Sequence, residues 1–138
     1  MAAIWLGIVC HMAAVTAFDL TEVQVRAGVP VAVMAQLTAE LGVSTPALLT
    51  WLQVAPRTWA RRKQAGRFDM LESDRVARLG RLVRRARNVL GGADEACQWL
   101  ALPNRALHGR SPFDVAATEV GAEAVFDLLG QLEHGVFS

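Results

Sequence analysis

Helix start and stop signals divide this chain at short intervals, and they constrain its fold more than any other feature. Glycine and proline interrupt the sequence at Gly28-Val29-Pro30, Gly42, Pro56, Gly91-Gly92 and Pro103. These positions mark helix ends or first turns, because glycine favours the residue after a helix and proline cannot continue one. No alternation of apolar and polar residues persists between them, so the sequence predicts an all-α fold.

Capping residues and apolar stripes place the helices between these breaks. We expect helices to begin at Asp19 or Thr21, near Val31, at Thr45 as the cap before Pro46, at Pro56, after Asp69 and after Thr118. Asp69 and Glu72 stand at capping-box spacing before the longest helix, whose inner stripe runs from Leu79 to Leu90. Along the last helix, Val125 to Leu132 supplies a packing face, and Glu119, Glu123 and Asp127 line an acidic one.

Charge is strongly segregated along the chain, although the formal net charge is only +1. Residues 57–87 hold eleven Arg or Lys against three acidic residues, whereas residues 88–138 hold two against seven. A basic block on a helical scaffold attracts polyanions and predicts salt-dependent affinity for nucleic acid. Within it, Arg78, Arg81 and Arg85 form a separate stripe, which is either solvated or a clamp on a nucleic-acid backbone.

Residues 45–52 and 56–65, joined by Gln53-Val54-Ala55, have the lengths and spacing of a helix-turn-helix. In that motif the second helix enters the major groove, and here Val54 and Trp59 are the expected buried anchors. The side chains expected to face DNA are polar and lie on or just after the second helix: Arg57, Thr58, Arg61, Arg62, Lys63, Gln64 and Arg67. Of these, Lys63 and Arg67 are expected to hold phosphates. The alternative is a solvated basic helix, or one that meets the acidic face of a partner subunit.

The sequence offers no constellation for catalysis or metal binding. Cys10 and His11 are neighbours on a helix and do not face each other, so they make a poor nucleophile and base. His108 and His134 lack a third ligand for a metal ion. We therefore predict a protein that is not an enzyme, with no catalytic residue, metal or cofactor. Cys10 and Cys97 match no redox spacing, which favours a reducing cytoplasm.

The first 18 residues form an apolar segment of uncertain role. Val15-Thr16-Ala17 resembles the cleavage site of a signal peptide, but no Lys or Arg precedes the apolar run. The 14 residues from Ile4 to Ala17 are too few to cross a bilayer of roughly 30 Å as a helix. We expect the segment to pack on the domain or at a subunit interface, with no membrane partner.

Two long stretches resemble the Xre/MbcA/ParS family of antitoxins. Residues 57–63, Gly66-Arg67 and residues 72–75 look like the family's Xre-like helix-turn-helix region. Trp99-Leu100, the joint formed by Pro103-Asn104, Leu107, Gly109 and Pro112, and the end at residues 133–136 resemble its toxin-binding domain. The resemblance spans roughly residues 25–138. It implies an Xre-like helix-turn-helix domain at 19–87 and a small helical toxin-binding domain at 88–138.

The resemblance also implies a function and a set of binding residues. Antitoxins of this kind neutralise RES-type toxins, which degrade NAD or transfer ADP-ribose, by covering the entrance to the toxin's active site. The toxin-binding residues expected here are Arg110, Leu132, Glu133, His134, Gly135, Val136, Phe137 and Ser138. Val136 and Phe137 are the expected apolar anchors, and the carboxylate of Ser138 the expected partner of a basic pocket. The alternative is that Val136 and Phe137 fold back onto this chain's own core.

Three positions depart from the family pattern. Gln53 stands where relatives commonly have glycine, Ala55 where they have a capping serine, and His108 where they often have glycine. A missing cap costs about 1 kcal/mol, although Pro56 partly compensates by preorganising the first turn.

We expect an antitoxin that forms a homodimer, assembles with its toxin and represses its own operon by binding operator DNA. One alternative is a stand-alone transcription regulator whose C-terminal part only dimerises, and another is an interaction module without DNA activity.

Overall fold

The computed structural model describes residues 15–135, and every regular element within that range is a helix. In chain order these are α2 (Glu22–Ala27), α3 (Val33–Leu41), α4 (Thr45–Leu52), α5 (Pro56–Ala65), α6 (Met70–Leu90), α7 (Ala93–Ala101), the 3-10 helix η1 (Arg105–Leu107), α8 (Pro112–Val115) and α9 (Glu119–Glu133). The all-α prediction is therefore confirmed for the described part of the chain.

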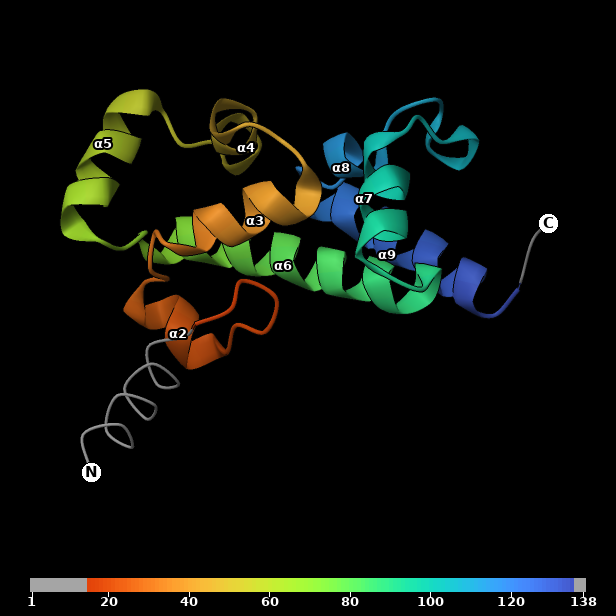
Figure 1. The fold of residues 1–138 in the computed structure, drawn as a ribbon, viewed down its shortest axis with the longest axis horizontal. Coiled ribbons are helices and arrows are strands. Elements are labelled where there is room, and N and C mark those ends of the chain that lie inside the picture. Colours follow the sequence, from red (N-terminus) through yellow and green to blue (C-terminus); the bar gives the residue numbers. More distant parts are fainter. Residues whose placement is uncertain (1–14, 136–138) are drawn as a thin grey trace.

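Helix α6 is the central helix, against which four of the other helices pack (Figure 1). It contacts α2 and α4 along one half and α7 and α9 along the other, while α5 stands at one end of the molecule. A single hydrophobic core runs through both halves, with Leu37, Leu52, Leu82 and Leu129 among its fully buried side chains. The predicted domain boundary between residues 87 and 88 falls inside α6 and stays a prediction.

Most helix ends lie where the local sequence places them. Thr21 caps α2, and Thr118 caps α9 by accepting a hydrogen bond from the backbone N–H of Gly121. Asp69 and Glu72 form the predicted capping box at the start of α6. The prediction for α4 is wrong by one residue, because the hydroxyl of Ser44, not that of Thr45, accepts from the N–H of Ala47, at 3.3 Å.

The end of the apolar N-terminal segment packs on the domain, as expected. Ala17 is fully buried, and its N–H donates to Oε1 of Gln36 at 2.8 Å. The chain crosses α6 at Gly80, where an added Cβ would lie 1.7 Å from the carbonyl oxygen of Ala17. Glycine is therefore required for this close approach. Residues 1–14 lie outside the described part of the chain.

We expect Gly80→Ala to lower the free energy of unfolding by about 2–3 kcal/mol, because the methyl group overpacks a rigid backbone contact. Urea denaturation followed by circular dichroism measures the change. The matched control is Gly130→Ala in α9, where an added Cβ meets nothing within 4 Å. That variant should gain up to about 1 kcal/mol from helix propensity. Equal stabilities for the two variants would contradict the close approach.

Candidate functional site

The turn between α4 and α5 contains two of the three departures from the family pattern. Gln53 ends α4 in the left-handed conformation, with φ of 58°, and such a backbone favours glycine. Ala55 is the N-cap of α5 and makes no side-chain hydrogen bond to the helix. Val54, between them, is buried as predicted, and its N–H donates to the carbonyl of Leu49 at 2.9 Å. The turn thus keeps its shape through backbone contacts and lacks two favourable residues.

We expect Ala55→Ser to raise the free energy of unfolding by about 1 kcal/mol, because the extended backbone of this residue is that of an N-cap. The serine hydroxyl would then accept a hydrogen bond from the first turn of α5. Ala60→Ser, at an exposed position inside α5, is the control and should lose about 0.5 kcal/mol. Chemical denaturation of both variants checks this, and a stability change of the same sign in both would refute the capping argument.

Helix α5 presents a basic, exposed stripe. Arg57, Arg61 and Gln64 follow one another at intervals of four and three residues on the exposed side, so they lie on one face. Lys63 is also exposed, with its ammonium 5.6 Å from the ring centre of Trp59. Thr58 is half-buried. Four of the seven residues predicted to face DNA are therefore accessible on α5 itself.

Arg62 does not belong to this stripe, so the prediction that it faces outward is wrong. Its Nε donates to Oε1 of Glu72 at 2.7 Å, and its Nη2 donates to Oδ2 of Asp69 at 3.1 Å. The hydrogen bond to Glu72 raises the pKa of Arg62 above its ordinary value. Because Asp69 and Glu72 also cap α6, one pair of carboxylates both starts α6 and holds α5 against it.

Arg67 is also engaged within the chain. Its Nη1 donates to the carbonyls of Ala27 and Gly28, at 3.5 and 3.2 Å, where α2 leaves carbonyl oxygens without helical partners. The prediction that Arg67 primarily holds a phosphate is therefore not supported by its placement. Trp59, only partly buried, stacks on Phe68 with ring centres 5.8 Å apart. These contacts fix the orientation of α5, which buries none of its own residues completely.

Trp51 joins the helix-turn-helix to the C-terminal helices, a role that the sequence pattern did not predict. Its Nε1 donates to the carbonyl of Phe113 at 2.7 Å, and the two rings stack with centres 5.8 Å apart. Arg78 lies 5.6 Å from the Trp51 ring and donates to the carbonyl of Ala117 at 3.1 Å. The predicted solvated or clamping stripe is therefore wrong for Arg78, which is packed between the two halves. The only available signal was the helical spacing of Trp51 with Leu48.

The joint after α7 presents Arg110 to solvent. The backbone of Asn104 and Arg110 pairs across the turn, and the side chain of Asn104 accepts from the N–H of Ala106 at 2.9 Å, which confirms its turn-forming role. His108 takes the left-handed conformation with φ of 59°, which explains why glycine suits this position. Arg110 is the predicted toxin-binding residue of this joint, and it is accessible.

The end of α9 holds the other predicted toxin-binding residues. Leu132 is half-buried against the core, and Glu133 forms an ion pair with Arg85, so both are engaged within the chain. His134 and Gly135 are exposed. Val136, Phe137 and Ser138 lie outside the described residues. On the adjoining face of α9, Glu119, Glu123 and Asp127 are exposed, as the acidic pattern predicts.

Family comparisons match both halves of this architecture. The profile of the antitoxin Xre-like helix-turn-helix domain matches residues 22–81, and that of the antitoxin Xre/MbcA/ParS C-terminal toxin-binding domain matches residues 85–135. The chain belongs to the Xre/MbcA/ParS antitoxin family. The first match ends at residue 81 and the second begins at residue 85, both within α6, so the two family domains share this helix.

Two curated proteins named "Antitoxin Xre" are similar to this family member. One, from Yersinia enterocolitica, is 46% identical over 79 residues, which is 56% of this chain and 53% of the relative. The other, from Photorhabdus laumondii, is 38% identical over 84 residues, which is 59% of this chain and 57% of the relative. The chain thus spans little more than half the length of these relatives.

Within residues 15–135, no helix is long and apolar enough to cross a membrane. The same residues contain no group of three or more His, Cys, Asp or Glu side chains arranged to hold a metal ion.

Proposed function

We propose that this Xre-family antitoxin acts in the cytoplasm, where it binds a RES-type toxin that degrades NAD or transfers ADP-ribose. The end of α9 and the residues that follow would cover the entrance to the toxin's active site. The observation that carries the proposal is the match to the toxin-binding domain, which extends to Gly135. His134 and Gly135, at the end of that match, are both exposed. The apolar Val136 and Phe137 come next in the sequence, and aromatic and aliphatic side chains are effective interface anchors.

Two charged side chains of the C-terminal half also bear on toxin binding. Arg110 is exposed on the joint before α8 and can pair with a toxin carboxylate. Glu133 already pairs with Arg85 at the surface, so its contribution to toxin binding would require exchange of one exposed ion pair for another. Such exchanges change the free energy little, which places the main binding energy in the apolar residues.

Coexpression with the product of the adjacent gene tests the proposal, with growth and cellular NAD as readouts. The full chain is compared with a version ending at Gly135, which retains the Arg85–Glu133 pair and every other described contact. We expect the full chain to protect and the shortened one to fail. A second version, ending at Gln131, also loses the packing of Leu132 and should fail too.

Each outcome separates the parts of the proposal. If the version ending at Gly135 protects, residues 136–138 are not needed for neutralisation, and the proposed toxin partner still holds. If no version, including the full chain, protects the cells, the proposed toxin partner is wrong. Circular dichroism of both shortened proteins distinguishes a lost contact from a lost fold.

We also propose that the protein represses its own operon through α5. Its exposed stripe of Arg57, Arg61 and Gln64 carries side chains that can hydrogen-bond base edges in a major groove. If the protein binds its promoter but protects against no adjacent toxin, the alternative of a stand-alone transcription regulator holds instead.

A further inference from the structure

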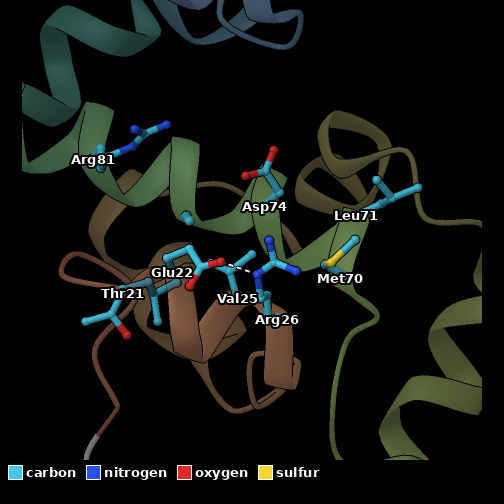
Figure 2. A pocket seen from close by; sticks show the side chains of 10 residues that line it. Thr21, Glu22, Val25, Arg26, Met70, Leu71, Asp74 and Arg81 are labelled. Carbon is cyan, nitrogen blue, oxygen red and sulfur yellow. Dashed lines mark hydrogen bonds and ion pairs between the residues drawn. The ribbon is translucent and has the colours of Figure 1, made fainter.

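An open groove of about 400 Å³ lies between α2 and the first half of α6 (Figure 2). Its apolar walls include Leu20, Val25, Met70 and Leu71. Met70 and Leu71 are 50% and 64% exposed, and Val23 on α2 is 72% exposed. Three of the five large hydrophobic side chains that are exposed in residues 15–135 therefore lie on or beside α2 and the start of α6.

The charges on the α6 side of the groove have a regular arrangement. Asp74 and Arg81 are seven residues apart on α6, which places them on one helix face about 10 Å from each other. Ala77, a small residue, lies between them and also lines the groove. Neither Asp74 nor Arg81 forms an ion pair with another side chain in residues 15–135, whereas Glu22 and Arg26 across the groove pair with each other.

We propose that this groove is the surface through which two copies of the chain associate. A two-fold axis passing close to Ala77 would place Asp74 opposite Arg81 of the partner subunit, and the reverse contact would follow from symmetry. A two-fold interface uses the same patch on both subunits, so the patch must complement itself. An acid three residues before a small central residue and a base four residues after it meet that requirement, and Met70 and Leu71 become covered by the partner.

The arrangement has a consequence for α5, which rests on the proposed operator binding. Only four residues separate the end of α5 at Ala65 from the start of α6 at Met70. A dimer held along α6 would therefore fix the two α5 helices relative to each other. Helix-turn-helix proteins need such a fixed separation to contact two half-sites of an operator. Self-association itself is independent of DNA.

Sedimentation equilibrium of the full chain, without DNA or toxin, tests the surface. Asp74→Arg should weaken the dimer by at least about tenfold, because it faces like charge twice in each dimer. The double variant Asp74→Arg with Arg81→Asp should restore most of the wild-type dissociation constant. A side chain with a purely structural role on α6 would not be rescued in this way. Leu71→Glu should abolish the dimer, and Val120→Glu, at a 78% exposed position on α9, should leave it unchanged.

Three results would overturn the proposal. The first is a wild-type protein that stays monomeric at about 100 µM, a concentration at which an interface of standard size is occupied. The second is a charge-exchanged double variant no better than Asp74→Arg alone. The third is a full chain that is monomeric while a version beginning at Val15 dimerises, which would assign the groove to residues 1–14. Because DNA is absent, none of these results depends on whether the operator proposal is correct.

Discussion

Replacing Trp51 with alanine is expected to lower the free energy of unfolding by about 3–5 kcal/mol, the usual cost of truncating a large aromatic side chain in a core. Trp51 is only 4% exposed, and the substitution removes its stack on Phe113 and its contact with Arg78. It also leaves the carbonyl of Phe113 without the indole N–H that now donates to it. The loss would be large, because small domains are stable by only about 5–15 kcal/mol.

Urea denaturation of Trp51→Ala and Trp51→Phe separates the two contributions. Phenylalanine preserves much of the packing but cannot donate a hydrogen bond, so we expect it to lose only about 1–2 kcal/mol. If both variants unfold at the same urea concentration, the hydrogen bond to Phe113 rather than the packing dominates. If neither variant differs from the wild type, Trp51 does not join the two halves of the molecule.

The second large effect is expected on DNA binding. We expect the double variant Arg57→Gln with Arg61→Gln to bind its promoter at least about 30-fold more weakly, because each arginine that contacts a base contributes roughly 1–3 kcal/mol of discrimination. Where an arginine instead contacts a phosphate, its loss also reduces the dependence of affinity on salt, by about one unit of slope for each contact. Both side chains are exposed and make no ion pair within residues 15–135.

Fluorescence anisotropy of labelled promoter DNA at several salt concentrations measures this effect. The control is Arg84→Gln with Arg105→Gln, which removes the same charge from exposed positions outside α5, although it also removes the surface ion pair of Arg84 with Asp19. An equal loss of affinity in the two double variants would show that net charge, and not the α5 stripe, attracts the DNA. Unchanged affinity in the α5 variant would remove operator binding from the proposed function.

Local sequence was sufficient for the helices because a cap is a contact between residues three or four positions apart. The capping hydrogen bonds between Asp69 and Glu72 and between Thr118 and Gly121 require no contact with distant parts of the chain. The error of one residue at Ser44 has the same origin, since two adjacent hydroxyl residues compete for one cap. The departures at Gln53 and Ala55 were also visible in the sequence, and the structure adds the reason, namely that both occupy cap positions.

Local patterns in the sequence were therefore sufficient to predict the all-α fold, most helix ends and the segregated charge. The partner of each arginine side chain depends instead on how the helices pack. Arg62, Arg78 and Arg85 resemble Arg57 in a sequence, yet their partners lie 10, 39 and 48 residues away along the chain. The physical reason is that a guanidinium binds whichever carboxylate or carbonyl the packing of other helices brings within reach. Folding thus divides one basic block into arginines that hold the molecule together and arginines that stay exposed, such as Arg57 and Arg61 on α5.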